Sequence, residues 1–184
     1  MVAKPQVDLA GIELLAMDVD GVLTDGTLVI HADGSESKCF NSLDGHGIVL
    51  WKRAGLKLAI VSGRASEPTL RRAEQLQIEH VFQDCHDKLP VFEKFLAQLG
   101  LAPEKAAYIG DDLTDLPLIR YVGFGVAVAN AVDEVKRYAD YVTVRPGGRG
   151  AVREVIEHIL KSSDRWRELM TRYLPPRVGA TEFS

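Results

Sequence analysis

The stretch IELLAMDVDGVLTDG, residues 12–26, decides the fold, because a short apolar run ends in two carboxylates and a glycine. Residues 12–17 have the length and the apolar content of a strand buried inside a parallel sheet. Asp18 and Asp20 follow it, and side chains two positions apart along an extended chain point the same way. The stretch therefore predicts a buried strand that delivers two acidic groups to one cleft.

Similar short runs alternate with helical patterns along the chain. Further strands are expected at residues 56–61, 80–83, 106–109, 125–129 and 141–144. Helices are expected at residues 48–54, 67–76, 89–99, 113–122, 133–139 and 149–160. This alternation favours an α/β fold, a Rossmann-like three-layer α/β/α arrangement around a mostly parallel sheet. Ligands of such sheets bind beyond the carboxyl ends of the strands.

Residues 27–40 break this alternation. The runs TLVIH and ESKCF flank the turn ADGS, and Asp33-Gly34 is a typical hairpin turn. A two-stranded hairpin is marginally stable in water, so we expect its edges to find a partner in this chain or in another copy. One domain is expected over residues 1–161. Residues 162–184 are expected to form an extension that starts as a helix and ends loosely ordered.

Composition restricts the range of functions. The 184 residues are 46% hydrophobic and 26% charged, as in ordinary globular proteins, and the net charge is −4. The chain lacks a basic stretch that would hold nucleic acid or an anionic membrane, and it lacks an apolar run long enough to span a membrane. The N-terminus has no apolar signal core, and Cys39 and Cys85 have no metal-type spacing, so we expect reduced thiols in a cytoplasmic protein.

Polar groups follow several predicted strands at their carboxyl ends. Besides Asp18 and Asp20, these groups are Ser62, Lys88, Asp111, Asp112 and Asp115. Each alone has an ordinary explanation, such as a solvated turn, a helix cap or a solvated lysine. Their coincidence at one edge of the sheet instead predicts a single joint site.

Carboxylates packed together need a counter-charge. At 4 Å and an effective dielectric constant near 20, a like-charged pair costs about 4 kcal/mol. One lysine does not offset two or three such pairs, whereas a divalent cation does, and an all-oxygen ligand set suits Mg²⁺. Such a site would bring a phosphoryl group beside a carboxylate nucleophile, with Ser62 and Lys88 holding the remaining phosphate oxygens.

Four segments together resemble the motifs of the haloacid dehalogenase-like hydrolase superfamily. They are DVDGVLTDG (18–26), VSGR (61–64), Lys88 and GDDLTD (110–115), and the resemblance covers about residues 12–160. It implies that Asp18 attacks phosphorus, and that Asp20 protonates the leaving oxygen and then deprotonates the attacking water. It also implies that Ser62, Gly63 and Lys88 bind the phosphoryl group.

The same resemblance implies a set of metal ligands. Asp18, Asp111 and the backbone carbonyl of Asp20 would hold Mg²⁺, with Asp112 and Asp115 supporting them from behind. The superfamily pattern favours Asp111 over Asp112 as the direct ligand, although the sequence leaves that choice open.

The gaps between these motifs exclude a cap domain. A domain needs at least about 50 residues, which is more than separate Asp20 from Ser62 or Ser62 from Lys88. A capless cleft is open to water, so another subunit is expected to cover it. The segments FNSLDGHGI (40–48), VSGR (61–64) and GGRGAVREV (147–155) are most similar to a capless branch, the 3-deoxy-D-manno-octulosonate 8-phosphate phosphatases.

That branch implies a homotetramer whose hairpins form a central barrel. It implies hydrolysis of a sugar acid phosphate, a step of lipopolysaccharide precursor synthesis. It further implies substrate contacts from Asn41, Asp44 and Gly45 in a loop, and from Arg64, Arg72 and Lys88. Arginines suit a sugar carboxylate, although Arg72 also fits a solvated helix position.

Three positions depart from the usual pattern of the branch. Leu43 and Val49 stand where arginine is usual, and His46 stands where tyrosine is usual. These departures concern recognition of the sugar acid rather than phosphoryl chemistry. A sister branch that acts on nine-carbon sugar acid 9-phosphates is therefore the alternative, and Arg64 favours the eight-carbon branch. We interpret His46 as a packing or hydrogen-bonding residue, because Asp20 already supplies the acid/base group.

Two alternatives come from other classes of protein. A phospho-receiver domain uses the same chemical groups, but its acidic pair lies at the end of the first strand and its acceptor at the third. Here the first strand ends in Asp-x-Asp and the acidic doublet follows the fourth. A non-catalytic oligomerisation module with a decayed site would lack motif positions, and this chain retains all of them. Either alternative predicts no steady-state turnover of an aryl phosphate.

Overall fold

The computed structural model describes residues 7–174 of the chain. Six parallel strands form the main sheet in the order β5-β4-β1-β6-β7-β8. Their bounds are Leu14–Met17 (β1), Lys57–Val61 (β4), His80–Phe82 (β5), Ala106–Gly110 (β6), Phe124–Ala127 (β7) and Tyr141–Val142 (β8). All six predicted strands are present, which confirms the parallel sheet.

Strand β1 is the centre of the molecule. All four of its residues are buried, and it pairs with β4 on one side and with β6 on the other. Later strands extend the sheet outward from both neighbours, so the strand order reverses at β1. The carboxyl end of β1 therefore opens on the crevice in which α/β sheets bind their ligands.

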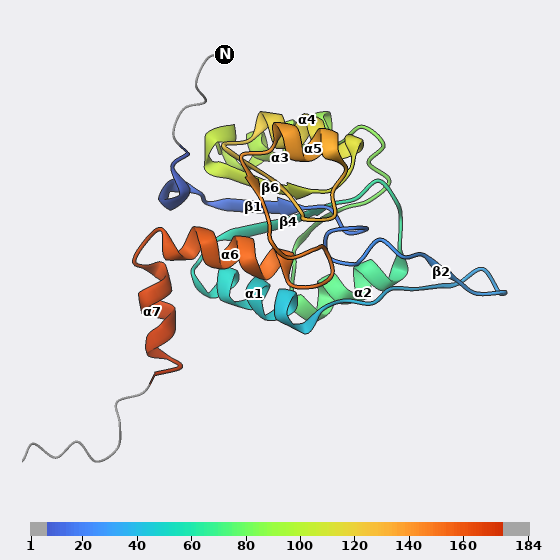
Figure 1. The fold of residues 1–184 in the computed structure, drawn as a ribbon, viewed down its shortest axis with the longest axis horizontal. Coiled ribbons are helices and arrows are strands. Elements are labelled where there is room, and N and C mark those ends of the chain that lie inside the picture. The colour runs from blue at the N-terminus through green and yellow to red at the C-terminus, as the bar shows by residue number, and fades with distance from the viewer. Residues whose placement is uncertain (1–6, 175–184) are drawn as a thin grey trace, which may run out of the picture.

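Helices cover both faces of the sheet (Figure 1). On one face lie α3 (Lys88–Leu99), α4 (Leu116–Tyr121) and α5 (Asp133–Tyr138), and on the other lie α1 (Ser42–Arg53), α2 (Glu67–Leu76) and α6 (Ala151–Lys161). The two helical layers bury the apolar sheet residues between them, as the strand and helix patterns require. The predicted three-layer α/β/α arrangement is confirmed.

Helix α1 begins at Ser42, six residues before the predicted start at residue 48. The side chain of Asn41 caps it, as an asparagine at this position does in many helices. Two glycines, Gly45 and Gly47, weaken the helical pattern in the sequence. Their packing explains them, because a β-carbon at Gly45 would lie 2.3 Å from an Arg72 nitrogen and one at Gly47 would lie 3.0 Å from the Arg153 side chain.

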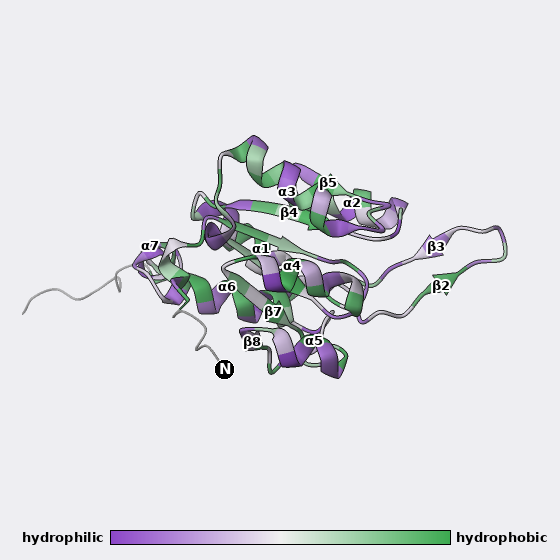
Figure 2. Cartoon of the chain, turned by 90° about the horizontal axis from the view of Figure 1, so that it is seen from above, coloured by the Kyte–Doolittle hydropathy of each residue, from purple (hydrophilic) through white to green (hydrophobic). Residues whose placement is uncertain are grey.

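The hairpin projects from the layered body (Figure 2). Its strands, β2 (Val29–Ile30) and β3 (Glu36–Ser37), are antiparallel as predicted but shorter than the predicted runs. Gly34 adopts a φ of 84° in the turn, a conformation that glycine takes without strain. Leu28, Val29 and Ile30 are exposed on the hairpin, so its apolar side lacks cover within the described part of the chain.

After α6 the chain forms one more helix, α7 (Arg165–Thr171). Trp166 and Leu169 of α7 pack against the core, and this helix confirms the predicted helical start of the extension. The predicted loose end falls partly on residues 175–184, which lie outside the described residues. Between residues 7 and 174, none of the helices has the length and apolar character needed to cross a membrane.

Candidate active site

Eight of the predicted site residues meet in one cleft of about 420 Å³ at the carboxyl ends of β1, β4 and β6. They are Asp18, Asp20, Ser62, Gly63, Arg64, Lys88, Asp111 and Asp112. Gly26, Cys85, His86 and Thr114 complete the lining. The sheet thus gathers groups that lie up to 94 positions apart in the sequence, as the parallel topology predicts.

The nucleophile loop, residues 18–26, starts as a continuation of β1. The Asp18 N–H donates to the Ile109 carbonyl at 3.0 Å, so the first candidate carboxylate is fixed to the sheet. The chain then turns at Gly21, whose φ is 85°. A β-carbon there would lie 2.0 Å from Oδ2 of Asp111, so only glycine lets the Asp111 carboxylate lie against this loop.

A second glycine-rich loop, residues 146–150, lies directly on the nucleophile loop. A β-carbon at Gly147 would lie 1.7 Å from the carbonyl oxygen of Gly21. The N–H of Gly148 donates to the Val22 carbonyl at 2.8 Å. The close approach explains the paired glycines in GGRG and joins the two loops by backbone contact.

Lys88 is the first residue of α3 and lines the cleft. Its Nζ lies 2.9 Å from Oδ2 of Asp18 and 2.7 Å from Oδ1 of Asp115. Burial lowers the pKa of Lys88, but the charges of Asp115 and Asp18 outweigh burial, and the net effect is a raised pKa. The ammonium group is therefore charged beside the candidate nucleophile.

Asp115 supports the site from a fully buried position. Its Oδ1 accepts hydrogen bonds from Lys88 and from the Tyr108 hydroxyl, the latter at 2.7 Å. Its Oδ2 accepts the backbone N–H groups of Asp111 at 2.9 Å and Asp112 at 3.3 Å. Both oxygens are occupied, so Asp115 orients its neighbours, although one of its oxygens lies within 4.8 Å of oxygens from Asp18 and Asp111.

The carboxylates of Asp18 and Asp111 lie close to that of Asp115, and Lys88 offsets only part of their negative charge. Burial, and then the nearby Asp115 carboxylate, raises the pKa of Asp18 from 3.8 to about 6. The same two causes, with Asp18 added, raise the pKa of Asp111 from 3.8 to about 8. Oδ1 of Asp111 is buried and has no hydrogen-bond partner. A buried oxygen without a partner, next to a second carboxylate, fits a divalent cation with oxygen ligands.

Asp112 serves a different purpose from Asp111. Its side chain accepts the Leu113 N–H at 2.7 Å and caps the short turn η3 (Leu113–Asp115), which precedes α4. The predicted helix over residues 113–122 therefore starts as a tighter turn. With Asp112 engaged in capping, Asp111 is the residue next to Asp18, as the sequence pattern favours.

Ser62 follows β4 and is buried at the base of the cleft. Its N–H donates to the Phe82 carbonyl at 2.8 Å, and its carbonyl accepts the Cys85 N–H at 3.0 Å. The backbone is thereby fixed on both sides, and Ser62 and Gly63 both line the cleft. This placement suits the binding of phosphate oxygens.

Asp20 lies between two cations that come from different segments. Lys38, from the hairpin, pairs with Oδ1 of Asp20, and its side chain is only 1% exposed. Arg64, after β4, approaches Oδ2 at 3.3 Å, and it also reaches Glu36 of β3 at 3.0 Å. The candidate acid/base residue is therefore held from the hairpin as well as from the sheet.

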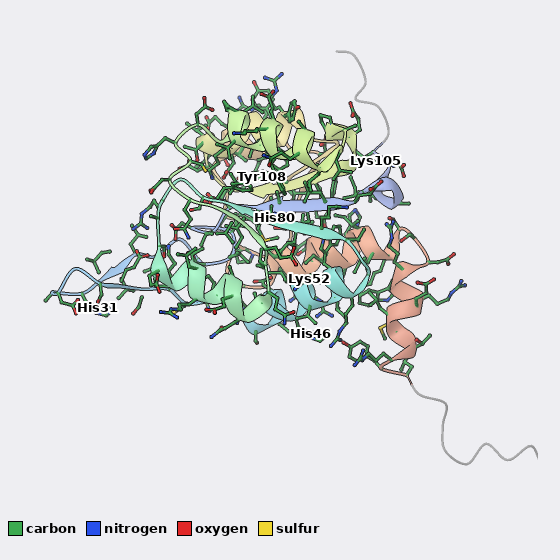
Figure 3. The ribbon with its side chains drawn as sticks, turned by 180° about the vertical axis from the view of Figure 1, so that it is seen from behind. His31, His46, Lys52, His80, Lys105 and Tyr108 are labelled. Carbon is green, nitrogen blue, oxygen red and sulfur yellow. The ribbon has the colours of Figure 1, made fainter. Side chains whose placement is uncertain are left out.

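Sequence reasoning missed two of these supporting residues, Lys38 and Tyr108. Lys38 lies in ESKCF, where alternation in a hairpin strand is typical of a solvated lysine. Tyr108 (labelled in Figure 3) is a fully buried hydroxyl within the otherwise apolar strand AAYIG. Such a tyrosine usually has a buried partner, and this was the one available signal for it.

Comparison with known proteins places this site in a family. Residues 81–156 match the family described as haloacid dehalogenase-like hydrolase. The 3-deoxy-D-manno-octulosonate 8-phosphate phosphatase of Yersinia pestis is 45% identical over 156 residues, which are 85% of this chain and 83% of that protein. This chain therefore belongs to the 3-deoxy-D-manno-octulosonate 8-phosphate phosphatases, a family of haloacid dehalogenase-like hydrolases.

Solved structures of this family agree with the fold. A probable YrbI family phosphatase from Pseudomonas syringae is 48% identical, with a TM-score of 0.89 over 92% of this chain and 96% of that one. The Moraxella catarrhalis 3-deoxy-D-manno-octulosonate 8-phosphate phosphatase is 41% identical, with a TM-score of 0.88 over 90% and 95% of the two chains. That structure is a complex with a magnesium ion, a phosphate ion and a KDO molecule.

Three predicted substrate contacts of the family lie outside the cleft of this single chain. The expected loop over residues 41–45 is instead the start of α1, because Asn41 caps that helix. The amide of Asn41 donates to the Gly148 carbonyl at 3.3 Å. Asp44 is buried and accepts the N–H groups of Gly150 at 3.1 Å and Arg153 at 2.9 Å. Asn41, Asp44 and Gly45 thus join α1 to neighbouring segments.

Arg72 and His46 also lie apart from the cleft. The guanidinium of Arg72 lies over the Phe40 ring, 5.8 Å from its centroid, and it also lies against Gly45. His46 lies 3.3 Å from the Tyr173 hydroxyl, with the two rings in an edge-on arrangement. The contact confirms the interpretation of His46 as a packing or hydrogen-bonding residue.

Proposed function

We propose that this chain is a Mg²⁺-dependent phosphatase that hydrolyses 3-deoxy-D-manno-octulosonate 8-phosphate to 3-deoxy-D-manno-octulosonate (KDO) and phosphate. The observation that carries the proposal is the position of Asp18, which pairs with Lys88 and lies within 4.8 Å of an oxygen of Asp111, a residue whose Oδ1 is buried without a hydrogen-bond partner. The magnesium, phosphate and KDO of the Moraxella catarrhalis complex support the same assignment.

The reaction proceeds in two transfers at Asp18. Its carboxylate attacks phosphorus, the bond between phosphorus and the sugar oxygen breaks, and Asp20 gives its proton to that oxygen. Asp20 then takes a proton from a water molecule, which attacks the aspartyl phosphate, and free phosphate leaves with Asp18 restored. Ser62, Gly63 and Lys88 hold the phosphoryl oxygens during both transfers.

Asp18, Asp111 and the backbone carbonyl of Asp20 are the residues that would hold Mg²⁺. When bound, the ion offsets the charge of an anionic phosphoryl group beside an anionic nucleophile. The pKa values of Asp18 and Asp111 are raised because burial and neighbouring carboxylates disfavour their charged forms, and a bound cation would favour those forms. Asp115 and Lys88 orient Asp18 and Asp111 from behind.

A panel of sugar acid phosphates tests the substrate. We expect the eight-carbon 8-phosphate to give the highest kcat/KM, above the nine-carbon sugar acid 9-phosphates and simple aryl phosphates. A higher kcat/KM for a nine-carbon substrate would assign the chain to the sister activity. Failure to turn over any phosphate ester above background would contradict the phosphatase assignment altogether.

We also propose a homotetramer held together by the hairpins, in the cytoplasm, where the product supplies lipopolysaccharide precursor synthesis. The exposed run Leu28, Val29 and Ile30, with Ile30 61% exposed, supports an apolar interface on the hairpin. The free thiols of Cys39 and Cys85 suit a reducing compartment. Light scattering should give a tetrameric mass, which Ile30→Glu lowers; a monomeric wild type would exclude the assembly.

A further inference from the structure

We infer that Lys38 is a positioning residue for Asp20, so that the hairpin sets the orientation of the acid/base carboxylate in its own chain. The inference rests on the proposed phosphatase function and concerns a residue that none of the motifs contains. It makes the hairpin part of the catalytic machinery, in addition to its proposed role in assembly.

The burial of Lys38 is the first observation. Lysine is almost never fully buried unless it is paired, yet this side chain is 1% exposed and its Nζ pairs with Oδ1 of Asp20. Lys38 lies just after β3, on the segment that returns from the hairpin to α1. A buried ion pair of this kind is strongly disturbed when one partner is removed.

The second observation is the asymmetry of the two Asp20 oxygens. Oδ1 contacts the buried Lys38, whereas Oδ2 faces Arg64, whose side chain is 42% exposed. Asp20 itself retains 21% exposure and lines the cleft. Lys38 therefore fixes one oxygen, while Oδ2 lies next to Arg64, which lines the same cleft as Asp20.

The third observation is how the hairpin is attached. Arg64 connects Asp20 to Glu36 of β3, so the order of contacts is Glu36, Arg64, Asp20 and Lys38. Both ends of this series belong to the hairpin segment, and the two middle residues, Arg64 and Asp20, lie in the loops that follow β4 and β1. Three ion pairs thus link the hairpin and Asp20, one directly through Lys38 and two in series through Arg64, and none of them involves the nucleophile Asp18.

The test uses the dependence on the leaving group. Phenyl phosphate needs a proton on its leaving oxygen, whereas 2,4-dinitrophenyl phosphate does not. For Lys38→Met we expect kcat/KM to fall about 100-fold with phenyl phosphate and less than about threefold with 2,4-dinitrophenyl phosphate. Lys38→Arg should restore most of the loss. Equal losses with both substrates would overturn the inference.

A double variant gives an independent readout. If Lys38 acts through Asp20, adding Lys38→Met to Asp20→Asn should lower the phenyl phosphate rate no further. A multiplicative loss in the double variant would overturn the inference. If Lys38→Met fails to fold, Lys38→Gln keeps a hydrogen-bonding group at the position. The inference is then tested by comparing the kcat/KM losses of Lys38→Gln with phenyl phosphate and with 2,4-dinitrophenyl phosphate.

The matched control is Lys105→Met. Lys105 also pairs with a carboxylate, Glu13, at 3.7 Å, but it lies at the opposite end of the molecule from the hairpin residue His31 (Figure 3). We expect its leaving-group ratio to equal that of the wild type. Both aryl phosphates are generic phosphatase substrates. The ratio of their kcat/KM values can therefore be measured even if the natural substrate is not the sugar acid phosphate. A wild type inactive on every phosphate ester would instead remove the proposed function and this inference together.

Discussion

Lys88 and Lys38 are both 1% exposed, and each pairs with one carboxylate of the Asp-x-Asp pair. Lys88 opens a 12-residue helix, and its Asp115 partner is held by a tyrosine and two backbone N–H groups. Lys38 stands beside a hairpin whose two strands have only two residues each. The proposed nucleophile Asp18 is thus held by the sheet and its helices, and the proposed acid/base residue Asp20 partly by a protruding segment.

The different surroundings of Lys88 and Lys38 correspond to two parts of the proposed reaction, the attack on phosphorus and the transfer of a proton. The proposed nucleophile Asp18 and the proposed metal ligand Asp111 directly follow β1 and β6, which are buried and paired on both sides. The proposed acid/base residue, Asp20, lies two positions further along the chain than Asp18, where Lys38 of the hairpin segment contacts it. We therefore expect changes on the Lys88 side to affect every substrate, and changes on the Lys38 side to depend on the leaving group.

Asp18→Asn should have the largest effect. The amide cannot attack phosphorus, so we expect kcat to fall by at least about 10³-fold for every phosphate ester while the fold is retained. Steady-state kinetics on the sugar acid and aryl phosphates measures this, with circular dichroism as the control for folding. Retention of more than about a tenth of kcat would exclude Asp18 as the nucleophile.

Lys88→Met should follow in size. Removing this ammonium leaves Asp18 and Asp115 without their shared cation, and we expect kcat to fall by about 10²- to 10³-fold for good and poor leaving groups alike. Lys88→Arg is the matched variant for charge. A loss confined to poor leaving groups would contradict the separation of the two lysines, because Lys88 would then act through proton transfer.

The metal-free enzyme should lose stability as the pH rises. The pKa of Asp18 is raised to about 6 and that of Asp111 to about 8, so their contribution is complete below about pH 4 and is lost as the pH rises through these values. Mg²⁺ at 100 times its high-pH Kd should restore about 2.7 kcal/mol at high pH, and the same concentration should restore less at low pH, where protons compete for the carboxylates.

Thermal unfolding at pH 5.5 and pH 8.5, with and without Mg²⁺, measures this dependence. Asp111→Asn should flatten the pH profile of the metal-free protein and reduce the response to Mg²⁺. A Tm shift by Mg²⁺ that is equal at both pH values, or unchanged in Asp111→Asn, would argue against these carboxylates as the metal ligands.

Glu36→Gln should have the smallest effect. Its ion pair with the half-exposed Arg64 is worth at most about 1 kcal/mol, so we expect less than about a fivefold change in kcat/KM. Comparing Glu36→Gln with Lys38→Met on the same substrates shows which of the two hairpin residues contributes more to the position of Asp20. A loss as large as that of Lys38→Met would shift the main attachment of Asp20 from Lys38 to the Glu36–Arg64 pair.

The sequence predicted well whatever depends on alternation and on strand ends. All six strands and the convergence of Asp18, Ser62, Lys88 and Asp111 follow from placing polar groups after apolar runs, since a parallel sheet brings those ends together. The start of α1 was placed too late because its glycines are required by packing against Arg72 and Arg153, which no local pattern reveals.

Contacts between side chains that are far apart in the sequence could not be predicted from the sequence. Lys38 and Asp20 are 18 positions apart, and only the path of the hairpin back to the sheet brings them into contact. Asp44 matched a family substrate contact, yet in this chain its carboxylate is bonded to the start of α6, 106 positions away. Motifs located the chemical groups, and the intervening segments determined what each group contacts.

The contact between Gly147 and Gly21 has a consequence for local motion. The two backbones touch because neither residue has a side chain at the contact, and the Gly148 N–H donates to the Val22 carbonyl, so we expect loop 146–150 to limit the opening of residues 21–25. Deuterium uptake in the two loops should therefore change together. Gly147→Ala should increase the mobility of the loop that begins at Asp18, although the two positions are more than a hundred residues apart in the sequence.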